Sequence, residues 1–354
     1  MRSLFILLCV LSTVTAAQVP ENPNKTDASG KRQGPWTILM DKNSIVTANP
    51  DSAVYYRVAT YKDDKPVTTV RDYHYKTGII QFEGTLTQDV PKVIYDGKAT
   101  WYNDQGQKEF EAEMKGEQVA GAYALYAEDG TLITEYADSL NKRGRELYQQ
   151  KKFTESIVFF KKASIRAKYE FGDKTAKRAA MLGNTALAYS KMDDYISAGP
   201  YSIKAVEIYR QLGETGTANY INMVAITATY WQIQKQYDKG EILFREVLAA
   251  TEKLSGKASD AYLIRLMNLG ICLVKGEKYA EAKPIYTEIR SRLEKPGYQD
   301  NRNFPSDYAT TMLRLGTINV KLRQLAEGKK VYEELLNYIT GKPGYEKIQS
   351  DLPR

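Results

Sequence analysis

Small residues recur with a fixed period along the second half of the chain. Gly144, Ala186, Ala228 and Gly270 stand 42 positions apart, and a fifth copy at Gly316 follows after 46. Each of the first four is followed by an aromatic residue nine positions later and by another small residue three positions after that. A period of about 20–50 residues is typical of a solenoid, in which each unit buries its apolar face against its neighbours.

The first half of the chain follows a period of two instead. Phe110, Ala112 and Met114 alternate with charged residues, which predicts a strand with one buried and one exposed face. Between residues 34 and 135 the alternation is interrupted by glycine, or by Asn43, which tolerate a left-handed backbone. The pattern therefore predicts a series of β-hairpins, long enough to supply the three or more strands that a stable sheet needs.

Within each unit of the second half, the apolar spacing predicts a pair of helices. With Gly144 counted as position 8, the first helix carries Leu140 and Leu147, and the second carries Phe160 and Ala163. This arrangement resembles the tetratricopeptide repeat (TPR), in which small residues at positions 8 and 20 let the two helices approach closely. The resemblance implies five helical pairs over residues 136–340 that form a right-handed superhelix, followed by a tail.

The resemblance can be narrowed to the longer repeats of the kinesin light chain type. The segments at 198–202 and 282–286 resemble the A-x-P-x-Y sequence of that class. Pro200 and Pro284 are expected near the first turn of the second helix, where a missing amide hydrogen costs least. Ser202 and Leu325 replace aromatic residues of the pattern, and their units are expected to pack less tightly.

A second resemblance concerns the β half. Residues 97–106 and 121–130 both run glycine, three residues, an apolar and aromatic pair, three residues, glycine. This pattern resembles the bacterial variant of the MORN repeat, seen in a family of antitoxin components. Together the two halves predict an α+β chain, with an antiparallel MORN-like hairpin array at 34–135 and an all-α TPR solenoid at 136–340. Residues 341–354 are expected to form the C-terminal tail.

The N-terminal segment predicts export. Residues 1–17 combine one positive charge, a short apolar run and small residues for cleavage, which is the pattern of a secretory signal peptide. A lipoprotein anchor at Cys9 is the alternative. Residues 18–33 are polar and contain two prolines, so they are expected to form a flexible tether. No second run of 18 apolar residues follows, and the mature chain is expected to lack a transmembrane segment and to be periplasmic, secreted or at the cell surface.

Residues able to perform catalysis or bind metals are scarce. His74 is the one histidine, and Cys272 is the one cysteine left after cleavage of the signal peptide. Zinc sites of the His and Cys kind need three or four such ligands, and no glycine-rich phosphate loop is present. A non-enzymatic protein is therefore expected, with no catalytic residue, metal or cofactor.

Charge is divided unevenly between the two halves. Residues 18–135 carry 13 Lys and Arg against 18 Asp and Glu, whereas residues 136–354 carry 36 against 25, a net of +11. Such asymmetry can indicate a nucleic-acid partner. The cations are nevertheless interleaved with carboxylates at helical spacing, as on a solvated helix face, and no nucleic-acid partner is expected.

The TPR resemblance also implies where a partner binds. In this family the concave groove is lined by the first helix of each pair, and an asparagine at position 6 bonds the backbone of a bound peptide. The implied groove residues are Lys142, Arg145, Asn184, Gln232, Asn268 and Arg314. The alternative is that the asparagines cap or solvate their own helices. The expected function is a scaffold or adapter that binds a peptide or protein; an antitoxin-like or immunity role for the β half is the alternative.

Overall fold

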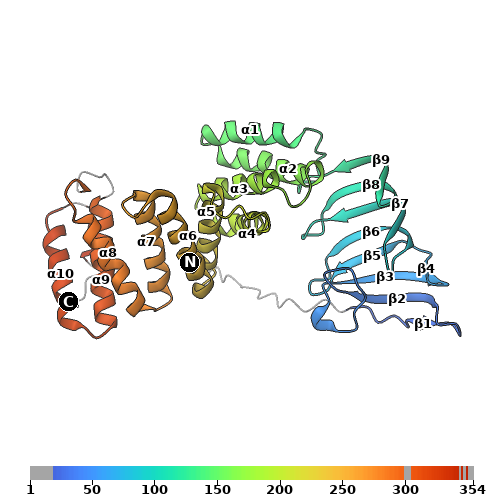
Figure 1. Cartoon of the computed structure of the whole chain (residues 1–354), viewed down its shortest axis with the longest axis horizontal. Helices are drawn as coiled ribbons and strands as arrows, with labels where there is room; N and C mark the ends of the chain where they lie inside the picture. Colours follow the sequence, from blue (N-terminus) through green and yellow to red (C-terminus); the bar gives the residue numbers. More distant parts are fainter. Residues whose placement is uncertain (1–18, 299–303, 343, 346–347, 350–354) are drawn as a thin grey trace, which may run out of the picture. The chain divides into compact units, whose positions relative to one another are not determined.

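The computed structural model describes residues 19–298, 304–342, 344–345 and 348–349, and the chain divides into two compact units (Figure 1). The first unit ends at Glu135 and contains the strands; the second begins at Tyr136 and contains the helices. The signal peptide expected at 1–17 lies outside the described residues, as does most of the expected tail.

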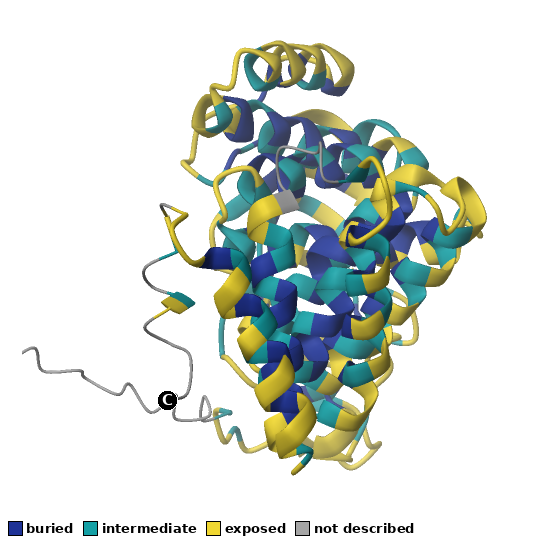
Figure 2. Ribbon diagram, turned by 90° about the vertical axis from the view of Figure 1, so that its left-hand side faces the viewer, coloured by how far each residue is buried: buried dark blue, intermediate teal, exposed yellow. Residues whose placement is uncertain are grey.

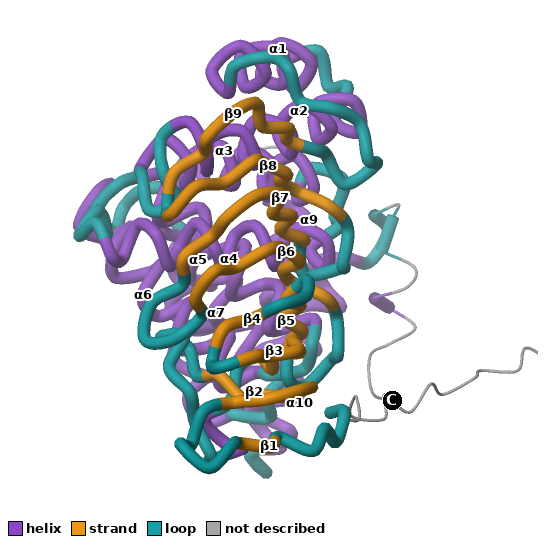
Figure 3. The backbone as a smooth tube through the Cα atoms, turned by 90° about the vertical axis from the view of Figure 1, so that its right-hand side faces the viewer, coloured by secondary structure: helices purple, strands orange, loops and turns teal. Residues whose placement is uncertain are grey.

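The described part of the first unit forms one nine-stranded sheet. The strands are β1 (Lys25–Thr26), β2 (Arg32–Met40), β3 (Tyr55–Lys62), β4 (Lys65–Pro66), β5 (Val70–His74), β6 (Ile80–Gln88), β7 (Ile94–Tyr102), β8 (Lys108–Gly116) and β9 (Gln118–Leu125). Apart from the short β4, which pairs with β3, each strand pairs antiparallel with the next along the chain. Figure 3 shows this succession across the sheet. The predicted hairpin array is confirmed as an antiparallel sheet.

One tight turn recurs in the β unit. At Asp27, Asp41 and Asn103 the side chain accepts hydrogen bonds from the backbone amides two and four residues further on. The third residue after each of them has a left-handed backbone: φ is +81° at Gly30, 61° at Ser44 and +77° at Gly106. A side chain that bonds its own turn favours this local structure. In the second turn the left-handed residue is Ser44, not the expected Asn43.

Residues 19–33, the described part of the expected flexible tether, make contacts with the sheet that composition does not predict. Lys25 and Thr26 pair with β2, and the amide of Asn24 donates to the Thr37 carbonyl. Arg32 forms an ion pair with Asp89 at 2.9 Å. The composition of a segment does not show that one of its residues pairs with a buried carboxylate 57 residues further along the chain. The ion pair between Arg32 and Asp89 helps to order this segment.

The second unit contains ten α-helices in its described residues, arranged as five successive pairs. They are α1 (Ala137–Gln149), α2 (Phe153–Glu170), α3 (Ala176–Ser190), α4 (Tyr195–Gln211), α5 (Ala218–Ile233), α6 (Tyr237–Ser255), α7 (Asp260–Lys275), α8 (Tyr279–Leu293), α9 (Phe304–Lys321) and α10 (Leu325–Ile339). Buried residues lie where helices meet and exposed residues face outward (Figure 2). The predicted fold class, a β-sheet followed by a TPR-like solenoid, is confirmed.

The turn inside each helical pair shows the same period as the small residues. One residue with a left-handed backbone stands in each turn, and none of the five is glycine: Lys151, Asp193, Lys235, Glu277 and Arg323, with φ between 57° and 61°. Side chains with a Cβ reach this conformation only at a cost. Because no glycine marks these turns, the sequence pattern locates the first four of them by the aromatic residue two positions later, and Leu325 takes its place in the fifth.

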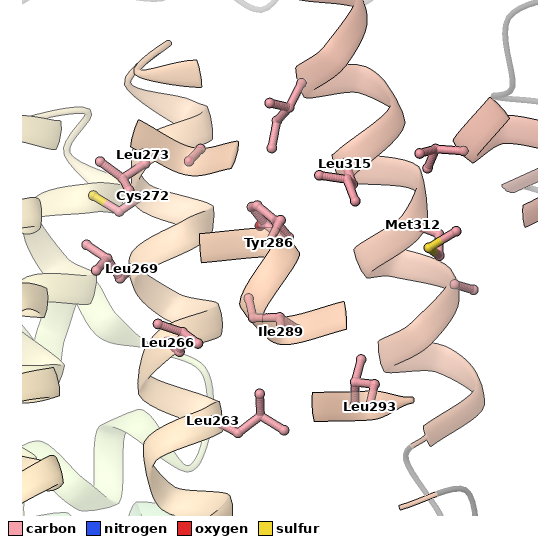
Figure 4. Close-up of a cluster of buried hydrophobic side chains, with 14 of the residues drawn as sticks. Leu263, Leu266, Leu269, Cys272, Leu273, Tyr286, Ile289, Leu293, Met312 and Leu315 are labelled. Carbon is pink, nitrogen blue, oxygen red and sulfur yellow. The ribbon is translucent and has the colours of Figure 1, made fainter. Parts of the chain in front are cut away.

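Packing inside the pairs explains why small residues recur. A Cβ at Gly144 would lie 2.6 Å from the ring of Phe160, and a Cβ at Gly316 would lie 2.4 Å from the ring of Tyr332. Glycine thus leaves room for an aromatic ring of the second helix. Figure 4 shows a buried cluster in the later pairs, to which α7, α8 and α9 contribute side chains such as Leu266, Ile289 and Met312.

Two expectations about the helical pairs need correction. Ser202 does not loosen its unit: it is fully buried, its hydroxyl donates to the Gly199 carbonyl, and it accepts a bond of 2.9 Å from Thr227. Pro200 and Pro284 are each the sixth residue of their helix, in the second turn, because the helices begin earlier than expected. Leu325, by contrast, remains 64% exposed and does not fill its turn.

Candidate functional site

The first helices of the pairs (α1, α3, α5, α7 and α9) carry all six sequence-predicted binding residues. Neighbouring first helices pack together, α1 with α3 and α3 with α5. Two hydrogen bonds between residues 43 apart join successive first helices: Asn184 donates to Asn141 at 2.8 Å, and Arg265 donates to Asn222 at 3.0 Å. Polar side chains therefore link these helices at the surface that the TPR resemblance assigns to a partner.

Lys142 and Arg145 are exposed on α1. Neither forms a hydrogen bond, ion pair or ring contact with any residue that the structure describes. Both charges are therefore available to a partner, and a partner would pay little desolvation cost in reaching them because they already face solvent.

The two asparagines at position 6 differ in their surroundings. Asn184 is half-buried and its amide group already donates to Asn141, so mainly its carbonyl oxygen is left for another bond. Asn268 is also half-buried, but among the described residues it has no hydrogen-bond partner. The alternative of a local structural role therefore fits Asn184 better than Asn268.

Gln232 and Arg314 complete the predicted set. The Oε1 atom of Gln232 is buried and accepts no hydrogen bond from a described residue, and a buried acceptor without a partner is costly. The Nη1 atom of Arg314 donates to the hydroxyl of Tyr286 at 3.2 Å. No hydrogen bond or ion pair joins the six residues to one another, so they form a row along successive helices and not a cluster.

Cations on the second helices are engaged with carboxylates of neighbouring pairs. The three bridges join Arg210 to Glu246, Arg245 to Glu281 and Arg290 to Glu334. Each bridge joins the second helix of one pair to the second helix of the next pair, so these ion pairs link successive pairs of the solenoid. The charges of these three arginines are thus locally neutralised, in contrast to those of Lys142 and Arg145.

A buried charge cluster in the β unit was not predicted. Asp89 is 2% exposed, accepts two bonds from the Arg32 guanidinium at 2.9 and 3.1 Å, and accepts another from the Tyr61 hydroxyl. Beside it, Arg57 donates to both oxygens of Asp72 at 2.7 and 2.8 Å, and its Nη1 lies 3.9 Å from Asp89. A clue was present in the sequence, since Arg57 occupies a position where the alternation of β3 requires an apolar side chain.

The surroundings of Arg57 favour its charged form, whereas burial raises the pKa of the Asp72 carboxyl. Burial disfavours the charge of Arg57, but the hydrogen bonds and negative charge of Asp72 outweigh burial and raise the pKa of the guanidinium. Burial, followed by the bond to Asp89, raises the pKa of the Tyr61 hydroxyl, which therefore remains a donor. Paired and hydrogen-bonded charges of this kind are the form in which ions are tolerated inside a protein.

The remaining reactive side chains have structural surroundings. His74 ends β5 and contacts the hydroxyl of Thr77 at 3.2 Å. Among the described residues no group of three His, Cys, Asp or Glu side chains could hold a metal ion. None of the helices that the structure describes has both the length and the apolar character to span a bilayer.

Cys272 is expected to react slowly with thiol reagents. The side chain is 1% exposed, and burial raises its pKa to about 11. Because the thiolate is the reactive species, labelling with a disulfide reagent at neutral pH should be slow in the native protein and fast in urea. Equal rates in the two states, followed by absorbance, would contradict the buried placement of this residue.

Comparisons with known proteins give structural similarity alone. No protein-family model matches the chain, and no curated protein matches it. Solved structures similar to it include TPR-like repeats. The kinesin light chain nearly identical TPR-like repeats of Podosopora anserina are 14% identical, with a TM-score of 0.47 over 58% of this chain and 96% of that one. BtubC of P. vanneervenii is 15% identical, with a TM-score of 0.46 over 61% and 83%. The apo form of RapI is 14% identical, with a TM-score of 0.47 over 60% and 74%.

Proposed function

We propose that the protein is a non-enzymatic scaffold whose first helices bind an extended peptide segment of a protein partner. The observation that carries this proposal is the exposed, unpaired state of Lys142 and Arg145 at one end of a row of first helices. Three arginines of the second helices, by contrast, are engaged with carboxylates of neighbouring pairs. A surface that leaves its charges unpaired favours association with the opposite charge.

The chemistry of the row indicates the kind of peptide. Asn268 has its amide and carbonyl free for the backbone of an extended segment, whereas the carbonyl oxygen of Gln232 is buried and does not face a peptide. The two cations at the α1 end add a preference for acidic side chains. The ligand is therefore an extended peptide, neutral along most of its length and acidic where it meets α1.

Reversing the two charges on α1 tests this proposal. Acidic peptides selected by the full chain from a random displayed library should bind the Lys142→Glu, Arg145→Glu double variant about tenfold more weakly at low salt. A matched control is Lys204→Glu with Lys330→Glu, which makes the same charge change at exposed positions of second helices.

Fluorescence anisotropy of the labelled peptides measures the dissociation constant of the peptide from each of the two double variants. Equal weakening by the two double variants would mean that net charge alone attracts the peptide and that the first helices are not the binding surface. Selection of basic or wholly apolar peptides would also overturn the proposal.

We also propose that the β unit is an array of MORN-like repeats and that the protein is exported. The repeated turn at Asp27, Asp41 and Asn103 supports the first statement, because the same local structure recurs along the sheet. The apolar run near the N-terminus supports the second. Sequencing of the mature N-terminus from the native source tests export: a protein that begins at Met1 would exclude cleavage.

An antitoxin-like or immunity role through the β unit is the alternative function. It rests on the resemblance of residues 97–106 and 121–130 to repeats of antitoxin components. The two functions differ in which unit carries recognition. A natural partner that still binds the α1 double variant, but is lost when exposed residues of the sheet are changed, would favour the alternative.

A further inference from the structure

The β unit contains a cavity of about 230 Å³ that has no part in the proposed function. Its main walls are formed by Tyr55 and Arg57 of β3, Asp72 of β5, Gln81 of β6, and Tyr95 and Trp101 of β7. The volume is below the ~300–1,000 Å³ typical of drug-sized ligands. A ligand that fills it is therefore small, of the size of one ring.

A β-bulge brings one polar wall residue into the cavity. Gln81 and Phe82 are consecutive, and in a regular strand they would point to opposite faces of the sheet. Both nevertheless line the cavity. The pairing of β5 with β6 shifts register here, since Phe82 is opposite Asp72 whereas Ile80 is opposite Tyr73. Bulges that redirect a side chain are frequent next to binding sites.

A bend in β7 brings two aromatic rings of the wall together. Six residues of regular strand span about 20 Å, yet the ring centroids of Tyr95 and Trp101 are 5.6 Å apart. Gly97 lies between them with a φ of +102°, and the register between β6 and β7 shifts at this point. Phe82 adds a third ring, with its centroid 5.3 Å from that of Trp101. The three rings are tilted by 57–65° to one another and form an apolar wall beside the polar one.

Two polar groups in the wall have unused hydrogen-bonding capacity. Gln81 and Tyr95 are half-buried, and among the described residues neither side chain has a hydrogen-bond partner. Burial raises the pKa of the Tyr95 hydroxyl, so it remains a donor at neutral pH. A wholly apolar ligand would desolvate these groups without bonding them, at a cost of about 1–3 kcal/mol for each.

The charges in the wall cancel. Arg57 binds both oxygens of Asp72, at 2.7 and 2.8 Å, and no other charged side chain of the described residues lines the cavity. An anion would find no excess positive charge, and a cation would find a carboxylate that is already neutralised. The wall therefore suits a neutral ligand that combines an apolar face with hydroxyl or amide groups.

We propose that this cavity binds one neutral pyranose ring of a carbohydrate. A pyranose has an apolar C–H face, which matches the rings of Tyr95 and Trp101, and a rim of hydroxyls that donate and accept hydrogen bonds. Gln81 and the Tyr95 hydroxyl bond this rim. The sheet thus contributes a glycan-binding site that is separate from the peptide surface of the helical unit.

The test combines a glycan array with titrations of the full chain. The protein should be retained by neutral glycans, and methyl pyranosides of the retained sugars should give saturable binding by calorimetry. The Gln81→Ala variant should weaken this binding about tenfold, the loss expected for one or two hydrogen bonds. The matched control is Gln105→Ala, at an exposed position of a β-turn. Trp101→Phe should also weaken binding, while Trp231→Phe in the helical unit should not.

Any one of three results would overturn the proposal. The first is that no neutral glycan retains the protein, and the second is that the Gln81→Ala and Gln105→Ala variants bind the sugar with equal affinity. The third is that choline or acetate binds as tightly as the sugars. Circular dichroism of the Gln81→Ala variant confirms that the sheet is intact. If sugar binding is not found, the peptide-binding proposal is unaffected, because that proposal is tested with peptides and with variants in the helical unit.

Discussion

The Asp89→Ala variant is expected to destabilise the β unit by about 3–5 kcal/mol, the cost of removing one partner from a buried ion pair. Asp89 accepts bonds from Arg32 and Tyr61 and lies 3.9 Å from the Arg57 guanidinium. Its loss leaves the Arg32 and Arg57 charges buried with less compensation. Since whole domains are stable by only about 5–15 kcal/mol, the β unit should be close to unfolding at room temperature.

The matched control for this prediction is Asp64→Ala. Asp64 also forms an ion pair with Arg32, at 3.1 Å, but its side chain is 49% exposed. Exposed pairs contribute at most about 1 kcal/mol, so the control should unfold close to the wild type. Urea titration followed by tryptophan fluorescence in a Trp231→Phe background reports on Trp36 and Trp101 of the sheet, and circular dichroism at helical wavelengths reports on the second unit. Equal midpoints for the two variants would contradict the role assigned to Asp89.

The helical half could be predicted from sequence because its information is local and repeated. The small residues at 42-residue intervals are required by rings that lie within the same pair, as for Gly144 and Phe160. A constraint of this kind recurs at Gly270 and Gly316, so one sequence shows it several times. The turns were harder to place, because Lys151 and its counterparts adopt the left-handed conformation without glycine.

The charge cluster of the β unit could not be assembled from the same evidence. Arg32, Arg57 and Asp89 come from three separate parts of the chain, and only the strand order brings them together. Periodicity marks Arg57 as a charged residue at an apolar position, but it does not name the partner. The cavity is even harder to predict from the sequence, because it depends on a bulge at Gln81 and a bend at Gly97 that break the alternation of buried and exposed residues.

The candidate binding residues on the first helices could be predicted from the sequence only in part. The TPR resemblance places all six residues on first helices, as the structure has them. It does not distinguish Asn184, which bonds Asn141, from Asn268, which has no partner among the described residues. That difference depends on the neighbouring helix at each position, so the repeat pattern alone could not provide it.

The Gly270→Leu variant is expected to destabilise the helical unit by about 3 kcal/mol, the upper end of the range for overpacked cores. A Cβ at Gly270 would lie 3.0 Å from the Tyr286 ring and 3.3 Å from Ile285, so the rest of a leucine side chain has no space. Leucine gains about 1 kcal/mol over glycine in helix propensity, but this gain is smaller than the overpacking cost. The neighbouring pairs share this core, so unfolding should spread beyond one pair.

Two variants make the Gly270 experiment decisive. Gly270→Ala adds only the Cβ, and its contacts at 3.0–3.3 Å require small shifts that the gain in helix propensity offsets, so its stability should be near that of the wild type. Gly216→Leu places the same leucine where no atom lies within 4 Å and should also melt like the wild type. Thermal melts followed by circular dichroism should therefore rank Gly270→Leu well below both. A melting temperature for Gly270→Leu equal to that of Gly216→Leu would mean that close packing of the helical pair is not the reason for glycine at this position.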